Sequence, residues 1–138
     1  MTNQRTLVLI KPDGVARGLV SHILGRIETR GYKLVALEMR TLTKEFAEEH
    51  YGEHKGKDFF DPLVTFITSG PLVAAVIEGP EVIAAWRAMQ GATNPFDAAP
   101  GTIRADLATS NRLNLTHGSD SEESAKREIG HFFPNLKH

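Results

Sequence analysis

The chain has 138 residues, a common length for one domain, and we expect a single domain over residues 1–138. A hydrophobic share of 41% and a charged share of 24% are typical of a globular protein and exclude a disordered or fibrous chain. The formal net charge of −1 excludes the broad basic surface that binds nucleic acid, so we assert no nucleic-acid partner.

The start of the chain predicts a strand, a turn and a helix. Thr6–Ile10 is a short run of β-branched and aliphatic residues that predicts a buried strand. Residues 11–14 read Lys-Pro-Asp-Gly, which is typical of a turn. Apolar residues then recur at helical spacing and predict an amphipathic helix over residues 19–30, which Gly31 ends in a left-handed conformation.

A second strand and a short helix are expected next. Residues 34–42 predict the strand, because apolar side chains alternate with charged ones there. The apolar residues are expected to share one face: Val35, Leu37 and Met39. Thr43 is suited to cap a short helix that continues to about Tyr51.

The middle of the chain predicts a helix, a third strand and another helix. Asp61 precedes a proline and is expected to cap the first of these helices, which ends at residues 70–71. Residues 72–77 form a continuous apolar run and predict the third strand. The helix that follows, over residues 82–89, is expected to end at Gly91.

An irregular segment precedes the last helix. Residues 91–115 have few periodic positions and predict a long loop, which is uncommon in a compact domain unless it has a function. Ser119 and Asp120 are both suited to cap the last helix, because an acidic residue stands three positions beyond each. Four apolar residues are expected to form its core face: Ala125, Ile129, Phe132 and Phe133. Strands that alternate with helices indicate an α/β or α+β domain of two layers.

Three familiar signatures of nucleotide chemistry are absent from the sequence. It has no glycine-rich loop followed by Lys-Ser or Lys-Thr, and no dinucleotide-binding fingerprint with spaced glycines. The loop, lysine and catalytic-loop residues of protein kinases are absent as well. Phosphate chemistry in this chain therefore needs another mechanism.

A histidine in a polar segment offers that mechanism. His117 stands at the end of the irregular segment, beside a glycine and directly before the polar first turn of the last helix. A neutral imidazole, with a pKa near ~6.5, attacks phosphorus without a base to deprotonate it, and a helix N-terminus favours a phosphate anion. Glu128 is suited to hold the distal ring nitrogen and so select the reactive tautomer. The alternative is that His117 only caps the helix.

Six short blocks of sequence stand in order along the chain. One is the octet Asn-Leu-Thr-His-Gly-Ser-Asp-Ser around His117. The other blocks are KPDG at 11–14, HYGEHKG at 50–56, TSGP at 68–71, GATNP at 91–95 and PGTIRAD at 100–106. Together they resemble the nucleoside diphosphate kinase family, and the octet is similar to the active-site signature of that family. The likeness extends nearly from end to end, and six blocks at matched spacing are far more specific than one tetrapeptide.

The resemblance implies a catalytic set of five residues. His117 is implied to be the phosphorylated residue, and Glu128 its supporting carboxylate. Ser119 is implied to bridge toward Glu128, and Tyr51 to lie close to the imidazole. Lys11 is implied to assist catalysis through its contacts with the nucleotide.

The resemblance also implies how the nucleotide is held. The residues implied to bind its phosphates are Lys11, Arg87, Thr93 and Arg104. Asn114 and Lys11 are implied to contact the ribose hydroxyls, His54 to reach a phosphate and Phe59 to stack on the base. Stacking accepts any base, because every base has a π-face, so broad nucleotide specificity follows.

The resemblance implies the fold, the reaction and the partners as well. The fold is a ferredoxin-like α+β domain in which a four-stranded antiparallel sheet of βαββαβ order is covered by helices, with the long loop, about 91–115, near the active site. The reaction moves the terminal phosphate of a nucleoside triphosphate, typically ATP, to a nucleoside diphosphate by a ping-pong mechanism and so maintains NTP and dNTP pools. Mg²⁺ is expected to be held mainly by the phosphates and water, because no carboxylate cage stands at ligand spacing. A homo-oligomer is expected, with a hexamer favoured and a tetramer as the alternative.

Two other functions compete with this interpretation. A nucleotide-binding regulatory domain would keep the phosphate site without turnover, and its mark would be a missing nucleophile. Residues 50–54 also match H-x-x-E-H, a zinc-hydrolase pattern that requires an unbroken helix, although Gly52 lies inside it.

The sequence also predicts the compartment. Its longest apolar run, residues 72–77, has the length of a strand and is too short to span a bilayer. The first residues carry no apolar signal-peptide core, and the chain has no cysteine. We therefore expect a cytoplasmic protein without a membrane partner.

Overall fold

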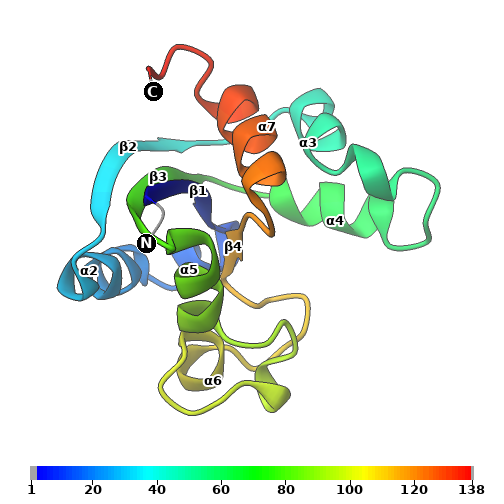
Figure 1. The fold of residues 1–138 in the computed structure, drawn as a ribbon. Coiled ribbons are helices and arrows are strands. Elements are labelled where there is room, and N and C mark those ends of the chain that lie inside the picture. Colours follow the sequence, from blue (N-terminus) through cyan, green and yellow to red (C-terminus); the bar gives the residue numbers. More distant parts are fainter. Residues whose placement is uncertain (1–2, 138) are drawn as a thin grey trace.

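The computed structural model describes residues 3–137, and its centre is one sheet of four antiparallel strands (Figure 1). The strands are β1 (Asn3–Ile10), β2 (Lys33–Arg40), β3 (Leu72–Pro80) and β4 (Thr116–Gly118), and they lie in the order β2-β3-β1-β4. Helices connect β1 to β2 and β3 to β4, and a further helical pair is inserted between β2 and β3. The predicted α+β fold with βαββαβ order is therefore confirmed.

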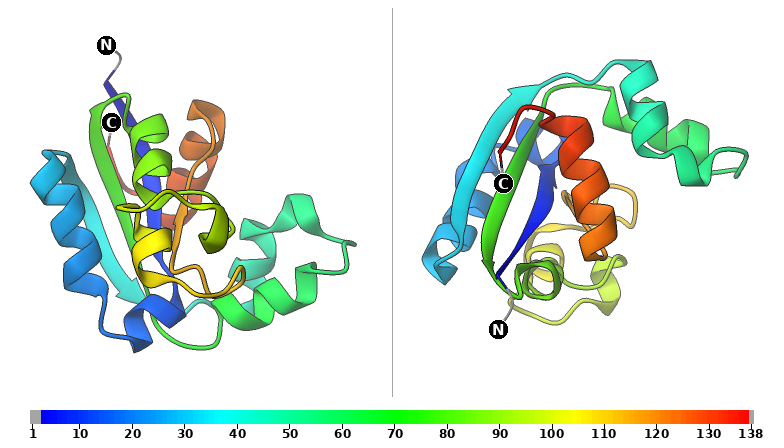
Figure 2. Two further views of the ribbon diagram at one scale, coloured as in Figure 1. Left: turned by 90° about the horizontal axis from the view of Figure 1, so that it is seen from below. Right: turned by 45° about the horizontal axis from the view of Figure 1, so that its top comes forward.

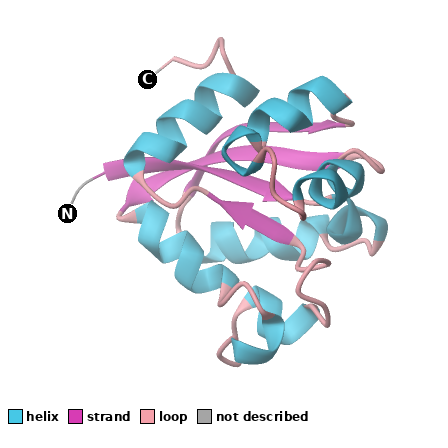
Figure 3. Cartoon of the chain, turned by 90° about the vertical axis from the view of Figure 1, so that its right-hand side faces the viewer, coloured by secondary structure: helices cyan, strands magenta, loops and turns pink. Residues whose placement is uncertain are grey.

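Helices cover both faces of this sheet (Figure 3). The α-helices and two short 3-10 turns are α1 (Pro12–Ala16), α2 (Val20–Arg30), α3 (Lys44–His50), η1 (Gly52–His54), α4 (Phe60–Ile67), α5 (Val82–Gln90), η2 (Pro95–Asp97), α6 (Ile103–Leu107) and α7 (Glu122–Phe132). The prediction of two layers is wrong, because the sheet is a middle layer with an apolar cluster on each face. Within residues 3–137, no helix combines the length and the apolar character needed to cross a bilayer.

Alternate residues of β1 supply the two clusters. Leu7 and Leu9 pack with Phe132 of α7 on one face, whereas Val8 packs with Trp86 of α5 on the other. A strand that is covered on both faces has no polar alternation, which accounts for the continuous apolar run over residues 7–10 of β1. The same burial holds β1 rigidly beside β4, and β4 carries the central residue of the site.

The edge strand β2 departs from the predicted pattern. A β-bulge between Leu34 and Ala36 interrupts its pairing with β3 and shifts the alternation of side chains. Val35 consequently packs against the core, whereas the side chains of Leu37 and Met39 are 53% and 57% exposed. The prediction that these three apolar residues share one face is therefore wrong.

Two helix starts differ from the sequence prediction and one agrees with it. The Lys-Pro-Asp-Gly segment opens α1, with Pro12 in its first turn, where the missing N–H of proline costs no hydrogen bond. Helix α4 begins at the buried Phe60 with Phe59 as its cap, so Asp61 lies inside the first turn and the predicted cap is wrong. Thr43 caps α3 as predicted, because its side chain accepts a hydrogen bond from the N–H three residues on.

The long loop over residues 91–115 is organised by η2 and α6, which appear in yellow tones in Figure 1. Thr102 caps α6 by accepting a hydrogen bond from the N–H of Ala105. Gly101 precedes this cap in a left-handed conformation with φ of 94°. Helix α6 was missed because five residues are too few to show a helical repeat in the sequence.

Candidate active site

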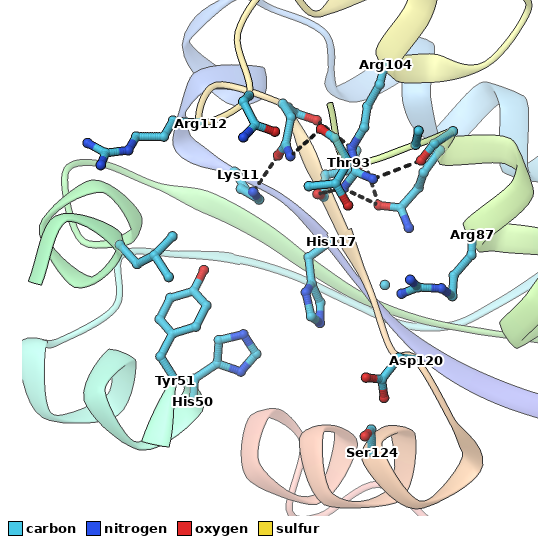
Figure 4. Close-up of a pocket in the computed structure, with 18 of the residues that line it drawn as sticks. Lys11, His50, Tyr51, Arg87, Thr93, Arg104, Arg112, His117, Asp120 and Ser124 are labelled. Carbon is cyan, nitrogen blue, oxygen red and sulfur yellow. Dashed lines mark hydrogen bonds between the residues drawn. The ribbon is translucent and has the colours of Figure 1, made fainter. Parts of the chain in front are cut away.

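The pair α3–α4 extends away from the sheet (Figure 2). A cavity of about 1020 Å³ is lined by residues of this pair and of the 91–115 loop. Lys11 and residues of β4, α5 and α7 complete its lining (Figure 4). The lining includes every predicted site residue except Ser119: Lys11, Tyr51, His54, Phe59, Arg87, Thr93, Arg104, Asn114, His117 and Glu128. The fold thus brings together side chains that are far apart in the sequence.

His117 lies on β4, and its backbone is held from two sides. It pairs with Leu9 of β1, and its carbonyl oxygen accepts a hydrogen bond from Trp86 Nε1 at 3.1 Å. Its side chain is 23% exposed and its ring points into the cavity in Figure 4. A short, doubly anchored strand therefore presents an accessible imidazole.

The start of α7 differs from the sequence prediction. Ser121 caps the helix by accepting a hydrogen bond from the N–H of Ser124. Ser119 and Asp120 are therefore not its caps, and His117 does not stand directly before the helix as expected. The capping prediction failed because Ser119 is fully buried in contacts with β1.

Ser119 connects β1 to Glu128. Its backbone N–H donates to Thr6 Oγ1 at 3.2 Å, and its Oγ accepts from the N–H of Leu7 at 3.2 Å. The hydroxyl proton of Ser119 then points to Glu128 Oε1, 2.8 Å away. Ser119 thus lies behind the cavity wall and positions the carboxylate.

Glu128 holds one ring nitrogen of His117. Its Oε1 lies 3.0 Å from His117 Nε2. A carboxylate can only accept, so Nε2 carries the proton and Nδ1 keeps its lone pair. Burial alone pushes the pKa of Glu128 up, but the hydrogen bonds and charge of His117 and the hydrogen bond from Ser119 hold that pKa below its ordinary value. The carboxylate is therefore ionised at neutral pH.

His50 and Tyr51, at the end of α3, lie on the same side of the His117 ring (Figure 4). The ring centroids of His50 and His117 are 5.2 Å apart in an edge-to-face arrangement. Burial, and next the neighbouring His117, lower the pKa of His50 to about 3, so this imidazole stays neutral. Burial raises the pKa of Tyr51 to about 12, so its hydroxyl remains a hydrogen-bond donor. Neither side chain adds a charge beside His117 at neutral pH.

Lys11 follows β1 directly and reaches into the cavity. Its Nζ donates to Asn114 Oδ1 at 2.6 Å, and its backbone N–H donates to the carbonyl oxygen of Leu115 at 2.8 Å. Burial, and then the charge of Arg104, lower the pKa of Lys11 to about 8. The ammonium is therefore close to losing its proton unless an anion joins it.

Arg104 of α6 is 8% exposed and is held by four acceptors. Its guanidinium donates to the carbonyl oxygens of Asn114 at 3.2 Å, Gly91 at 3.0 Å and Thr116 at 2.8 Å, and to Gln90 Oε1 at 3.3 Å. Burial lowers the pKa of Arg104 to about 10, which still leaves it cationic at neutral pH. These contacts use four of the five guanidinium N–H groups and leave one for a ligand.

Exposed cations lie on opposite sides of the cavity. Arg87 of α5 and Arg112 of the long loop stand on either side of His117 in Figure 4. Thr93, also exposed, lies on the loop wall, where its carbonyl oxygen accepts a hydrogen bond from the side chain of Asn114. Together with the lysine and the buried arginine, these cations make the cavity suited to a polyanion.

An aromatic surface lies beside α4. Phe59 is 41% exposed, and the ring of His54 lies 5.2 Å from its ring in an edge-to-face arrangement. Lys57 Nζ lies 5.7 Å from the Phe59 ring centroid. The exposed part of the phenyl ring offers a face on which a planar, polarisable group can stack.

The zinc-hydrolase alternative does not fit this geometry. It requires His50 and His54 on one continuous helix, but α3 ends at His50 and η1 forms a separate turn. Within residues 3–137, no group of three or more histidine, cysteine, aspartate or glutamate residues lies close enough to hold a metal ion.

The lining also contains residues that the sequence analysis did not assign to the site: His50, Gln90, Arg112, Asp120 and Ser124. Asp120 follows His117 closely in the same polar segment, so its position could have been anticipated. Gln90 gave no such signal, because its role depends on the approach of Arg104 and Thr116, whose hydroxyl donates to Gln90 Oε1 at 2.7 Å.

Comparisons with known proteins agree on one family. Residues 4–137 match the family model described as nucleoside diphosphate kinase. The chain is 61% identical over 136 residues to a nucleoside diphosphate kinase of Parafrankia sp. (strain EAN1pec), covering 99% of each chain. It is 59% identical over 130 residues to one of Deinococcus radiodurans, covering 94% of each. A solved structure of a halophilic nucleoside diphosphate kinase from Halobacterium salinarum in complex with CDP superposes with a TM-score of 0.94 at 48% identity, covering 97% of this chain and 90% of that one.

Proposed function

Because the chain belongs to the nucleoside diphosphate kinase family, we propose that His117 carries the phosphate that this enzyme moves between nucleotides. The enzyme transfers the terminal phosphate of a nucleoside triphosphate to a nucleoside diphosphate. The observation that supports His117 as the carrier is its ring, which faces a cationic cavity while Glu128 holds Nε2. A regulatory domain without turnover would lack such a nucleophile.

In the first half-reaction, Nδ1 of His117 attacks the terminal phosphorus. The N–P bond forms as the bond from that phosphorus to the β-phosphate bridging oxygen breaks, and the nucleoside diphosphate leaves with the electron pair. Glu128 accepts a hydrogen bond from the Nε2–H group, and its negative charge offsets the positive charge that develops on the ring. In the second half-reaction, a β-phosphate oxygen of another nucleoside diphosphate takes the phosphorus, and the imidazole regains its lone pair.

The phosphates of the nucleotide fit the cationic side of the cavity. Lys11, Arg87 and Arg104 supply the charge, and Thr93 supplies a hydroxyl on the loop wall. Phosphoryl transfer requires mainly positioning and charge stabilisation from the protein, which these residues can provide. The ribose contacts are assigned to Asn114 and Lys11, whose side chains are joined by a hydrogen bond of 2.6 Å, and His54 is assigned to a phosphate.

The base is assigned to the aromatic surface. Stacking on Phe59 requires only a π-face and is worth ~1–3 kcal/mol, so purines and pyrimidines are both expected to bind. The relative from Halobacterium salinarum was solved with CDP, which supports a nucleoside diphosphate with a pyrimidine base as one ligand of this cavity.

Magnesium fits this site as an ion carried by the phosphates. The lining holds carboxylates, but Glu128 is engaged by His117 and Ser119, which leaves Asp120 and Glu53 as the acidic groups at the cavity. Mg²⁺ retains several waters and needs few protein ligands when phosphates bind it, and Asp120, which lines the cavity, would be available to contact the hydrated ion. The ion would neutralise phosphate charge, while the protein residues orient the nucleotide.

The exposed edge of the sheet supports a homo-oligomer. Leu37 and Met39 of β2 are more than half exposed, and an apolar edge strand of this kind is unfavourable on an isolated monomer. We favour a hexamer and keep a tetramer as the alternative. A mass from light scattering distinguishes the two assemblies, and a monomer would contradict the proposal.

The phosphate carrier is tested by labelling. The protein is mixed with ATP labelled at the terminal phosphate in the absence of an acceptor, and an acid-labile, alkali-stable label on His117 is expected. Addition of CDP should discharge the label as CTP. The His117→Gln variant should bind ADP but take up no label. Two outcomes would contradict the proposal. The variant could transfer phosphate as well as the unmodified protein, or it could lose transfer activity and still take up the label.

A further inference from the structure

The buried Arg104 depends on a short helix for its position. It belongs to α6, which lies inside the long loop and has only five residues. A helix of one or two turns has little stability of its own in water, so its place must be fixed by contacts with the rest of the protein. On its inner side, Ile103 is fully buried in the core and Arg104 makes its four hydrogen bonds.

The outer side of α6 is held by Arg26, which belongs to α2. Arg26 Nη2 lies 2.9 Å from Asp106 Oδ2, and Nη1 donates to the carbonyl oxygen of Gly101 at 3.0 Å. The other oxygen of Asp106 accepts the N–H of Gly101 at 3.0 Å. The Arg26 guanidinium, the Asp106 carboxylate and the backbone N–H and C=O of Gly101 therefore form a closed set of hydrogen bonds immediately before Thr102, the cap of α6.

Neighbouring groups orient Arg26 for this contact. Its Nε donates to His22 Nε2 at 3.0 Å, one turn earlier on α2, so all three guanidinium nitrogens are engaged. The hydrogen bond from Arg26 is the largest cause that holds the pKa of Asp106 below its ordinary value, so the carboxylate is charged at neutral pH. A planar guanidinium with several bonds fixes orientation in a way that a lysine cannot.

Arg26 itself lies outside the cavity lining. We propose that Arg26 is a positioning residue that acts through Asp106 and Gly101 to hold α6, and with it Arg104, at the phosphate end of the cavity. This inference rests on the proposed contact between Arg104 and the nucleotide phosphates. Because a small displacement of a binding group weakens its interaction strongly, loss of the outer contact lowers nucleotide affinity without removing any group from the cavity.

The test is a comparison of ADP affinity by calorimetry, together with kcat and KM, for single and double variants. Arg26→Gln is expected to raise the dissociation constant of ADP about three- to tenfold, while kcat at saturation changes less than about twofold. Arg26→Lys should recover part of the affinity, because it can still donate to Asp106. The control is Arg30→Gln, one turn further along α2, where the guanidinium lies 5.8 Å from the Tyr32 ring. That variant should leave affinity unchanged.

The double variant separates this inference from the proposed function. If Arg26 acts through Arg104, Arg26→Gln should cause no further loss in an Arg104→Gln background, whereas independent effects add. An additive loss, or an unchanged ADP affinity in Arg26→Gln alone, overturns the positioning role. If Arg104→Gln binds ADP as well as the unmodified protein, the phosphate assignment of Arg104 is wrong. An equal loss of affinity in Arg30→Gln would show a general effect of α2 and also overturn the inference.

Discussion

The lowered pKa of Lys11 predicts that nucleotide binding takes up a proton in alkaline solution. Burial and the neighbouring Arg104 place this pKa at about 8 when the cavity holds no anion. A bound phosphate stabilises the charged ammonium and raises the pKa again. Binding therefore takes up a proton from solution in proportion to the fraction of free protein in which Lys11 is neutral. This fraction increases as the pH rises through about 8.

The size of the effect follows from that pKa. With a value of about 8, roughly one in ten free molecules has a neutral Lys11 at pH 7, about half at pH 8 and roughly nine in ten at pH 9. ADP binding should then take up about 0.1, 0.5 and 0.9 proton at these three pH values. Because only the protonated form binds well, the apparent dissociation constant should rise about tenfold between pH 7 and pH 9.

Calorimetry of ADP binding in buffers of different ionisation enthalpy measures this uptake directly. Lys11→Met should abolish it, and the exposed Lys126→Gln of α7, outside the cavity lining, should keep it. Absence of proton uptake at pH 9 would contradict the lowered pKa of Lys11 in the free protein. Uptake that survives in Lys11→Met would show that the proton belongs to another group.

Three further predictions concern the nucleophile, the base and the backbone of the site. Glu128→Gln removes the charge opposite His117 and should slow phosphoryl transfer on the order of 100-fold in rapid-quench measurements, and an unchanged rate would exclude the carboxylate from catalysis. Phe59→Ala should raise KM for every nucleotide, by about tenfold, with little change in kcat; a loss confined to purine nucleotides would contradict stacking as its role. Gly118→Ala would place a Cβ 2.5 Å from Trp86 Cδ1 and 2.8 Å from its Nε1, so we expect the free energy of unfolding, measured with denaturant, to fall by ~1–3 kcal/mol. An unchanged free energy of unfolding would show that Trp86 can move to make room for the added methyl group.

The sequence predicted the regular parts of the fold well because their signals are local. The apolar runs of β1 and β3 reflect burial on both faces, and the apolar spacing in α2, α5 and α7 reflects one buried side. The bulge in β2 was not predictable, because it arises from pairing with β3. The same holds for β4, whose three residues become a strand only by pairing with β1. Ser119 resembled a helix cap in sequence, but contacts with Thr6 and Leu7 bury it instead.

The candidate site was predictable in composition more than in geometry. The sequence predicted that Glu128 holds the distal ring nitrogen of His117, and the structure agrees, but no sequence pattern indicated that Ser119 lies behind the cavity wall and is bonded to β1. Nor could the sequence show that Arg104 is engaged by four acceptors, or that Arg26 holds its helix from outside. Such relations join residues that are distant in sequence, and no local pattern records them.

The proposed mechanism requires that Nδ1 of His117 attacks phosphorus. The protein can be phosphorylated with ATP, unfolded in alkali to preserve the phosphoramidate, and examined by ³¹P and ¹H NMR, which distinguish the two phosphohistidine isomers. Because Glu128 Oε1 lies 3.0 Å from Nε2, we expect the phosphate on Nδ1. Phosphate on Nε2 would mean that this hydrogen bond is broken in the reacting enzyme, and it would contradict the assigned role of Glu128.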